Sequence, residues 1–362
     1  MAKSNGKRKW KKGLIVGICA ALVLVAAVGV IGAAYWYRTI GLINQAQQTE
    51  STLTPEEQSA ALEEILGPTL AETEPSEATE EPTINPEEYI ANTPNIINIL
   101  LIGQDARGSH ISKLTDTMIL CTVNREQKTL TLTSFARDLY VKMPSYNGST
   151  YGKNRLNVAY SLGWLYHGEG AGMEMLDQCL LENFGVQVDH NIEVDFVAFE
   201  QIVDLLGGVD IELTEREAYH LSYNNESGML WSLEEGVNHL TGLQALEYAR
   251  IRKLDNDFER TNRQRKVISA LLNQSRDLTF AEFDKLLTTV LPLLTTDMDS
   301  GKITEYAFAV LPILPELEIR SQVIPQPDQY YFANAGTEEA PMSVIMPHLE
   351  TIREFLRETI GG

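Results

Sequence analysis

The sequence predicts a layered α/β/α domain with a mixed central sheet, preceded by a single transmembrane helix and a disordered acidic linker. Three features support this fold class. Short apolar runs alternate with segments of helical spacing over residues 94–362, which is typical of a layered α/β domain. An uncharged apolar run occupies residues 13–37, and the residues between these two regions are strongly acidic. The C-terminal region, roughly 270 residues, can form one hydrophobic core.

The N-terminal residues predict an anchor in the cell membrane. Six Lys and Arg side chains precede the apolar run Gly13–Tyr37, which is long enough to cross a bilayer as a helix. This excess of positive charge indicates that residues 1–12 form a cytoplasmic basic tail and that the C-terminal domain is extracellular. The aromatic residues at 35–37 favour an uncleaved anchor, whereas the small residues at 29–34 leave signal cleavage open.

Residues 38–93 are predicted to form an extended, negatively charged tether. Between Thr39 and Thr93 the chain has no Lys or Arg but twelve Glu, with proline recurring among Ser, Thr and Ala. Such a composition buries too little apolar surface to offset the entropy lost when the chain is ordered. A short helical turn is expected at 60–66. We therefore expect a spacer that holds the domain away from the membrane.

Strands and helices follow one another from residue 94 onward. The run IINILLIG predicts a buried strand, and two further strands surround a turn at 124–127. Alternating Thr and Leu at 129–133 predict a sheet whose two faces differ. Segments of helical spacing end at glycine, a common helix terminator. The expected strands are 96–103, 116–124, 128–136, 190–196 and 209–213, and the expected helices are 172–185, 196–208 and 342–359.

Cysteine content and net charge narrow the class of protein. Cys19 lies in the apolar run, and Cys121 and Cys179 lie in apolar segments of the domain. Buried free thiols are therefore preferred over a bridge between the last two. The formal net charge of -21 repels nucleic acid, which argues against a transcription regulator.

A basic island interrupts this acidic chain at 248–266, where seven side chains are cationic and three are acidic. A capping box of Thr241 and Gln244 predicts a short helix that ends next to Arg250 and Arg252. If the chain is extended there, the two arginines point to the same side. They are therefore candidates for binding one anionic group.

A second helix in the island is expected to start near Asp257, which suits the N-cap position. Two arginines and a glutamine fall on its apolar stripe, and two more cations fall on a face expected to be solvated. The core-facing arginines either pair with carboxylates such as Asp255 and Asp257 or bind an anion. The core-facing residues are Arg260, Arg263 and Gln264, and the solvated ones are Arg265 and Lys266.

Charged residues also gather at the ends of the predicted strands. The first strand is followed by Asp105 and Arg107, the second begins at Asp116, and the third is closed by Arg137 and Asp138. Functional groups of open α/β sheets lie at strand ends, although a strand-end Asp is more often a turn or cap residue. Asp105 and Asp116 suit Mg²⁺, or Mn²⁺, held partly by substrate phosphates. Arginine binds phosphate oxygens bidentately, so the combination predicts a pyrophosphate site.

Seven segments of the chain are similar to the LytR-CpsA-Psr family of cell-envelope proteins. In order they are NILLIGQDAR, LTDTMIL, TSFARDLYV, RLNVAYSLG, FEQIVDLLGGVDIEL, HLTGLQALEYARIRK and DNDFERTNRQRKVI, covering Asn98 to about Ser275. The resemblance implies a phosphotransferase that moves an anionic glycopolymer, such as a teichoic acid or capsular polysaccharide, from a polyprenyl-pyrophosphate carrier to peptidoglycan. The acceptor would be the C6 hydroxyl of N-acetylmuramic acid, and the lipid would occupy an apolar tunnel within the domain.

The resemblance also implies roles for individual residues. Asp105 and Asp116 match metal-associated acids, and Arg137 and Asp138 are expected to complete the catalytic group. Either Asp116 or Asp138 would orient or deprotonate the sugar hydroxyl. The residues that match pyrophosphate-binding positions, or that line or support the same pocket, are Arg107, Arg137, Arg155, Arg250, Arg252, Arg260, Arg263 and Gln264.

The sequence departs from the family pattern at two positions, and two functions other than transfer are alternatives. Arg155 stands where the family usually has Lys, with Lys153 nearby, and Ala136 replaces the Pro before the Arg-Asp pair. A lipid-binding envelope module without catalysis would need the arginines but not the acids. A pyrophosphate hydrolase would use the same residues with water as the acceptor. The choice of polymer is expected to depend on the loops at 145–154 and 219–229.

Overall fold

The computed structural model describes residues 32–51, 53–66, 89–90, 95–104, 113–146, 148–276, 284–285, 288–336 and 341–361. The chain divides into two compact units, residues 1–42 and 43–362. In the first unit, residues 32–40 are helical, whereas residues 13–31 of the predicted anchor lie outside the described residues. No helix in the described part of the chain has the length and apolar character that a membrane span requires. The anchor therefore stays a prediction.

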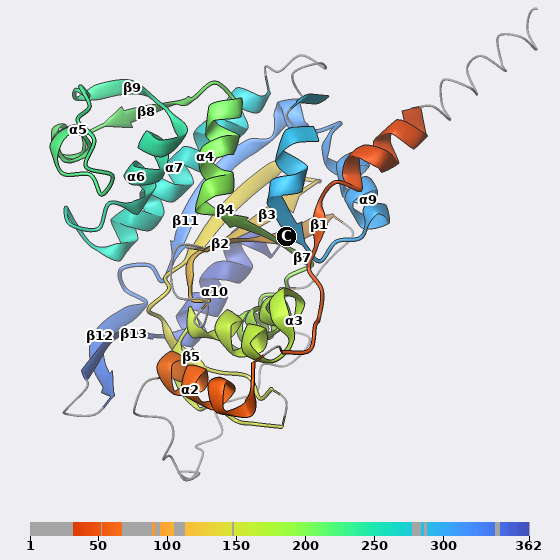
Figure 1. The fold of residues 1–362 in the computed structure, drawn as a ribbon, viewed down its shortest axis with the longest axis vertical. Helices are drawn as coiled ribbons and strands as arrows, with labels where there is room; N and C mark the ends of the chain where they lie inside the picture. Colours follow the sequence, from red (N-terminus) through yellow and green to blue (C-terminus); the bar gives the residue numbers. More distant parts are fainter. Residues whose placement is uncertain are drawn as a thin grey trace, which may run out of the picture. The chain divides into compact units, whose positions relative to one another are not determined.

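A seven-stranded mixed sheet forms the centre of the second unit, as the sequence predicts (Figure 1). The strands lie in the order β1-β10-β7-β2-β3-β4-β11. In the middle of the sheet, β3 is antiparallel to both β2 and β4, while β7 is parallel to β2 and β11 is parallel to β4. The strand bounds are β1 Asn44–Gln45, β2 Ile96–Gln104, β3 Thr115–Asn124, β4 Thr129–Phe135, β7 His190–Asp195, β10 Leu294–Thr296 and β11 Glu318–Ile324.

Helices cover both faces of this sheet. They include α3 (Val158–Phe184), α7 (Asp257–Ser275), α9 (Ser300–Val310) and α10 (Leu349–Ile360). Alternate residues of each strand point to opposite faces, so neighbouring side chains enter different cores. Leu100 and Met118 pack in the core formed with α3 and α10, whereas Ile97 and Ile119 pack in the core formed with α7 and α9. This arrangement confirms the predicted layering.

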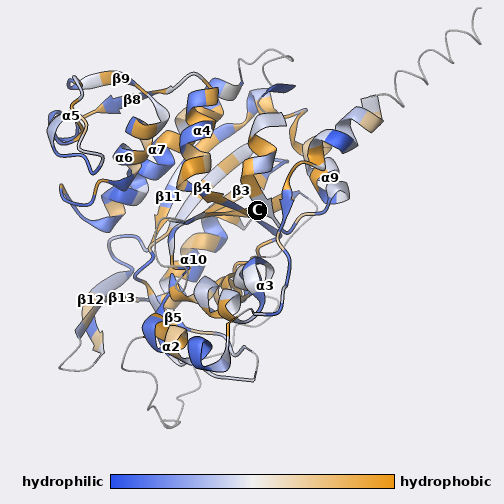
Figure 2. Cartoon of the chain, in the orientation of Figure 1, coloured by the Kyte–Doolittle hydropathy of each residue, from blue (hydrophilic) through white to orange (hydrophobic). Residues whose placement is uncertain are grey.

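A third core joins a smaller group of elements beside α7. These are α4 (Phe196–Leu205), β8 (Val209–Leu213), α5 (Glu215–Tyr223), β9 (Gly236–Leu240) and α6 (Gly242–Arg250). α4 is apolar along most of its length (Figure 2). The predicted capping box opens α6, because the Thr241 side chain accepts a hydrogen bond from the Gln244 amide. α6 begins so close to α4 that a Cβ added to Gly242 would lie 2.2 Å from the carbonyl oxygen of Glu200.

The segment predicted to be a disordered tether is partly folded. β1 pairs with β10, and α2 (Pro55–Leu66) packs its buried residues Ala61 and Ile65 in the core that contains α3. A capping pair starts this helix, since the Thr54 amide donates to the Glu57 carboxylate at 2.8 Å. The tether prediction is therefore wrong for this part, where two apolar side chains at helical spacing outweigh the acidic composition. Residues 67–88 and 91–94 lie outside the described residues.

The end of the chain differs from the expected helix at 342–359. A hairpin of β12 (Tyr330–Gly336) and β13 (Pro341–Pro347) precedes α10, which begins at Leu349. The prediction is wrong before that residue, because Val344 and Ile345 are β-branched and Pro347 cannot continue a helix. Cys121 and Cys179 are free thiols, as predicted.

Candidate functional site

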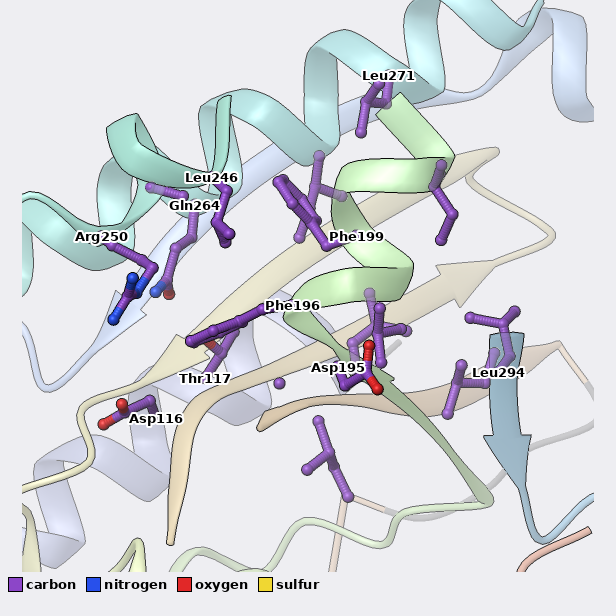
Figure 3. Close-up of a pocket in the computed structure, with 18 of the residues that line it drawn as sticks. Asp116, Thr117, Asp195, Phe196, Phe199, Leu246, Arg250, Gln264, Leu271 and Leu294 are labelled. Atoms are coloured by element: carbon purple, nitrogen blue, oxygen red, sulfur yellow. The ribbon is translucent and has the colours of Figure 1, made fainter. Parts of the chain in front are cut away.

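A cavity of about 450 Å³ lies between the central sheet and the helices α4, α6 and α7 (Figure 3). Most of its walls are apolar, and the side chains come from elements far apart in the sequence. Its lining residues without a formal charge are Leu101, Ile102, Gly103, Thr117, Ile192, Val194, Phe196, Phe199, Ile202, Leu206, Leu246, Ala249, Gln264, Ile268, Leu271, Leu272, Val290, Leu291 and Leu294. This composition suits a hydrocarbon chain.

One end of the cavity is charged. Asp116, Arg250 and Gln264 lie together at this end in Figure 3, away from Leu271 and Leu294. Two further arginines that line the cavity, Arg252 and Arg260, contact Asp116 there. The sequence therefore builds an amphipathic cavity, with a mostly apolar interior and a cationic end. Asp195 also lines the cavity, away from the arginines in Figure 3, and its carboxylate accepts a hydrogen bond from the Ala198 amide at the start of α4. A long apolar molecule with an anionic head group would match this arrangement of apolar walls and charged end.

Asp116 is the carboxylate at the centre of the charged end. Its side chain accepts a short hydrogen bond from Arg137 and a 2.9 Å hydrogen bond from Arg252, and its carbonyl oxygen accepts a 3.4 Å hydrogen bond from Arg260. Burial alone would raise the pKa of Asp116, but the charges of Arg137 and Arg252 outweigh it and the pKa is lowered. Asp116 is therefore a stable anion that fixes the positions of the arginines.

A second group of ion pairs extends from Arg137 away from the cavity. The Arg137 Nε lies 3.6 Å from both Asp138 Oδ2 and Asp257 Oδ1, and Asp138 Oδ1 lies 3.4 Å from Arg155 Nε. Arg260, of which only 2% is exposed, contacts Asp257 at 2.6 Å. None of Arg137, Asp138 and Arg155 lines the cavity itself. The site thus has one side that faces the cavity and another that faces the solvent.

Buried polar atoms at this site lack hydrogen-bond partners among the described residues. They are Arg137 Nε, Arg155 Nε, Asp257 Oδ2, Arg260 Nε, Arg260 Nη1 and Gln264 Oε1. Burial raises the pKa of Asp257 against the opposing charges of Arg260 and Arg137, and burial lowers the pKa of Arg260. Unpartnered buried polar groups cost free energy, so their concentration here supports a binding role for this end of the cavity.

Arg250 and Phe196 form the cavity end nearest to α4. The Arg250 guanidinium lies 4.8 Å from the centre of the Phe196 ring and pairs with Glu226 at 2.9 Å. The prediction of a mouth loop at 219–229 is wrong for residues 219–223, which belong to α5, but Glu226 in the remainder of this segment does reach the charged end. Arg250 and Arg252, two residues apart, reach different carboxylates but line the same cavity, as their spacing predicts.

Arg263 has a structural position away from the cavity. It donates to Glu217 at 2.8 Å and to the carbonyl oxygen of Ile251 at 3.0 Å, and it makes a short contact with Asp255. Only 2% of its side chain is exposed. Its core-facing orientation is confirmed, but the alternative of pairing with a nearby carboxylate explains it. Arg263 does not line the cavity in which pyrophosphate is expected to bind.

Two expectations for α7 are wrong. Asn256, rather than Asp257, is the N-cap, since its side chain accepts from the Glu259 amide at 3.1 Å. Arg265 is buried rather than solvated: it donates to Ser321 Oγ at 3.1 Å, and burial lowers its pKa to about 10. The helix packs against β11 as well as beside α6, so its buried stripe is wider than the apolar residues indicate.

Two predicted site residues, Asp105 and Arg107, lie outside the described residues. Within the described ranges, no group of three or more His, Cys, Asp or Glu side chains can hold a metal ion. Asp116 offers oxygen atoms of the type that Mg²⁺ prefers, but both already accept hydrogen bonds from arginines. The donor set therefore fits only a metal that takes most of its ligands from substrate phosphates, from water or from residues 105–112.

Sequence reasoning did not identify the cavity walls, whereas it did give Asp257 as one of the carboxylates that pair with the core-facing arginines. The walls include Phe196, Phe199 and Leu271, whose apolar character alone does not distinguish them from core residues. Asp257 pairs with two arginines of the site. Its position three residues before Arg260, at a helix start, was the available signal.

Comparisons of the sequence with known proteins find a family and named relatives. The model of the LytR_cpsA_psr family matches residues 64–343. The polyisoprenyl-teichoic acid--peptidoglycan teichoic acid transferase TagT of Bacillus subtilis is 27% identical over 293 residues, which cover 80% of this chain and 77% of TagT. TagU of Oceanobacillus iheyensis, named for the same activity, is 32% identical over 221 residues, covering 59% of this chain and 63% of TagU.

Solved structures show the same fold. The structure of TagT bound to LIIa-WTA superposes with a TM-score of 0.58 and 24% identity, covering 79% of this chain and 98% of that one. A Streptococcus agalactiae protein superposes with a TM-score of 0.59 and 25% identity, covering 76% of this chain and 91% of that one.

Proposed function

Because the chain belongs to the LytR_cpsA_psr family, we propose that it is a transferase that moves an anionic glycopolymer, of the teichoic acid or capsular type, from a polyprenyl-pyrophosphate carrier to peptidoglycan. The observation that carries this proposal is the amphipathic cavity, whose apolar walls end at Arg250, Arg252 and Arg260. The relatives TagT and TagU are named as teichoic acid transferases that act on peptidoglycan, which supports the same reaction class.

The division of the cavity explains how the carrier would bind. The polyprenyl chain would lie between the sheet and α4, α6 and α7, against side chains such as Phe199 and Leu271. The pyrophosphate would lie at the charged end, where Arg252 and Arg137 are held close together by Asp116. Arginine binds phosphate oxygens bidentately, and a preorganised pair costs little to reorient during the reaction.

The reaction then needs a hydroxyl in line with the bond that breaks. The acceptor oxygen, which we propose to be the C6 hydroxyl of N-acetylmuramic acid, forms a bond to the phosphorus that carries the glycopolymer. The bond from this phosphorus to the bridging oxygen breaks, and polyprenyl phosphate leaves toward the cavity. Arg137, Arg252 and Arg260 would neutralise the charge that develops on the phosphate oxygens.

Asp138 is our choice for the residue that accepts the proton of the hydroxyl. Asp116 is less suitable, because both of its oxygens accept hydrogen bonds from arginine and its pKa is lowered. Asp138 lies on the solvent-facing side, with its oxygens 3.4 Å from Arg155 and 3.6 Å from Arg137. An Asp138→Asn variant should keep carrier binding and lose transfer, whereas normal turnover would remove this role.

A metal ion and a membrane anchor complete the proposal. Mg²⁺, or Mn²⁺, would be held by Asp116 and Asp105 and would supply further neutralisation of the phosphate oxygens when bound. The single-pass anchor at 13–37 would place the catalytic domain outside the cell, where both peptidoglycan and the carrier head group are accessible.

The test is a transfer reaction with the full chain in detergent. It would be incubated with a polyprenyl-pyrophosphate glycan, a peptidoglycan oligomer and Mg²⁺, and the products would be analysed by mass spectrometry. A phosphodiester-linked glycan on the oligomer is expected, and it should disappear in Arg252→Ala. Lys253→Ala is the matched control, because Lys253 is the exposed neighbour that does not line the cavity. Bound carrier without product would indicate a binding module, and free phosphorylated glycan would indicate a hydrolase.

A further inference from the structure

Three aromatic rings lead away from the solvent-facing side of the site. Phe258 follows Asp257 directly in α7, and its ring centre lies 5.2 Å from that of Tyr330 at the start of β12. The Tyr330 ring centre lies 5.3 Å from that of Phe332, whose side chain is 65% exposed. We call Phe258, Tyr330 and Phe332 the aromatic track.

Hydrogen bonds attach the β12–β13 hairpin, which carries Tyr330 and Phe332, to the site. The amide of Ile345 in β13 donates to the carbonyl oxygen of Asp138 at 2.9 Å. The Arg155 Nη2 atom donates to the carbonyl oxygen of Ser343 at 2.8 Å, while its Nε atom faces Asp138. Figure 1 shows the hairpin reaching away from the central sheet. The track therefore begins at the ion pairs of the site and ends in solvent.

Only one face of the hairpin continues the site. Tyr330 and Phe332 are two residues apart in β12 and share a face, whereas Tyr331 between them points to the other face. The Tyr331 ring lies near that of His348, at 5.8 Å, and it is 52% exposed. Beyond Phe332, the cross-strand pair of Asn334 and Ser343 adds polar groups on the same face as the track.

The direction from which the hydroxyl attacks determines which molecule contacts this face of the hairpin. The leaving oxygen belongs to the carrier, which enters the cavity, so an in-line attack must come from the side opposite the cavity. That side holds Arg137, Asp138 and Arg155, none of which lines the cavity, and it is where the hairpin is attached. The molecule that brings the attacking hydroxyl must therefore pass along this face.

We propose that the exposed end of the aromatic track, at Phe332, binds a pyranose ring of the acceptor glycan and so positions the attacking hydroxyl beside Asp138. Phe258 and Tyr330 are half-buried against the core and support the Phe332 ring. The proposal rests on the transferase function proposed above. A sugar ring has an apolar C–H face that packs on an aromatic ring while its hydroxyl groups stay hydrated. An exposed phenylalanine next to Asn334 and Ser343 offers both kinds of contact.

The test measures acceptor and carrier binding separately on the full chain. The acceptor probe is a peptidoglycan glycan tetrasaccharide, titrated by calorimetry, and the carrier probe is a polyprenyl-pyrophosphate disaccharide. Phe332→Ala should weaken tetrasaccharide binding by roughly three- to tenfold, the range for the loss of one aromatic contact, and should raise the acceptor KM of transfer by a similar factor. Phe332→Tyr should retain binding, because the ring is kept.

The control is Tyr331→Ala, which removes an exposed ring from the same strand on the opposite face. It should leave tetrasaccharide binding unchanged, and carrier affinity should be unchanged in every variant. Equal tetrasaccharide affinity in Phe332→Ala and the wild type would overturn the proposal, and transfer that is still lost in Arg252→Ala would leave the transferase function standing. Weaker carrier binding in Phe332→Ala would show that this face binds the donor glycan, which would also overturn the proposal. Phe332-dependent binding without any transfer would instead refute the transferase function alone.

Discussion

Replacing Arg263 by methionine should destabilise the protein without removing a contact to the substrate. The Arg263 side chain is 2% exposed and pairs with Glu217, which is 9% exposed, at 2.8 Å. It also donates to the carbonyl oxygen of Ile251 and contacts Asp255. Methionine is shorter and has no charge, so Glu217 would keep its hydrogen bonds from Thr214 but would be left as a buried anion without its cationic partner.

Removing one partner of a buried pair typically lowers the free energy of unfolding by about 3–5 kcal/mol. For a domain of this size, 1 kcal/mol shifts the Tm by about 2 °C, so the Tm should fall by roughly 6–10 °C. Thermal unfolding followed by circular dichroism would measure the change. Arg252→Met is the matched control, because Arg252 is 49% exposed and its loss should leave the Tm nearly unchanged while it abolishes transfer.

The pH dependence of stability gives an independent reading of the same pair. Burial alone would raise the pKa of Glu217, but hydrogen bonds from Thr214 and Arg263 outweigh it and the pKa lies below the ordinary value of 4.5. The pair therefore stabilises the protein above that value, and this stabilisation is lost as the pH falls through the lowered pKa. In Arg263→Met, the loss of stability below pH 4.5 should be smaller than in the wild type.

A second substitution tests the cause of the effect. Glu217→Gln in the Arg263→Met background should recover part of the lost Tm, since it removes the uncompensated charge. An Arg263→Met protein with the Tm of the wild type but without carrier binding would refute this reasoning. It would show that Arg263 acts as a ligand of the pyrophosphate.

Three further predictions concern other parts of the second unit. Arg265→Met should raise the Tm by a few degrees, because Arg265 is buried with its Nη1 atom unpartnered among the described residues; a lower Tm would contradict this. Leu271→Trp should fill the apolar end of the cavity and weaken carrier binding at least tenfold, measured by calorimetry with the polyprenyl-pyrophosphate disaccharide; unchanged affinity would place the lipid elsewhere. Gly242→Ala should lower the Tm measured by thermal unfolding, because the added Cβ would lie 2.2 Å from the carbonyl oxygen of Glu200. An unchanged Tm would show that α4 and α6 can move apart to make room for the methyl group.

The sequence predicted the central sheet well because its strands are short apolar runs bounded by turns. β2, β3 and β4 lie within one or two residues of the expected ranges. The hairpin and the helix near the C-terminus were harder to predict, since periodicity alone does not separate a strand of β-branched residues from a buried helix. Pro347 marks the boundary, because proline cannot continue a helix whatever the apolar spacing around it.

The charged part of the site was predictable because arginines and acids stand out at strand and helix ends. Asp116, Arg137, Arg252 and Arg260 are brought together as the motifs indicate. The pairing of Arg252 with Asp116 was not predictable, because it joins segments more than a hundred residues apart, whereas the pairs of Arg260 with Asp257 and of Arg263 with Asp255 are local. Local spacing identified Arg263 as buried and Asp255 as a partner, but not its contact with Glu217.

The ordered segment before residue 67 has a consequence for any truncated form of the protein. β1 covers one edge of the sheet by pairing with β10, and α2 buries Ala61 and Ile65 against the core beside α3. A fragment that begins at residue 94 would leave unpaired the edge of β10 that faces β1, while the other edge stays paired with β7, and it would expose apolar surface on α3. Such a fragment should aggregate or lose stability, whereas one that begins at residue 43 keeps both the sheet edge and the helix.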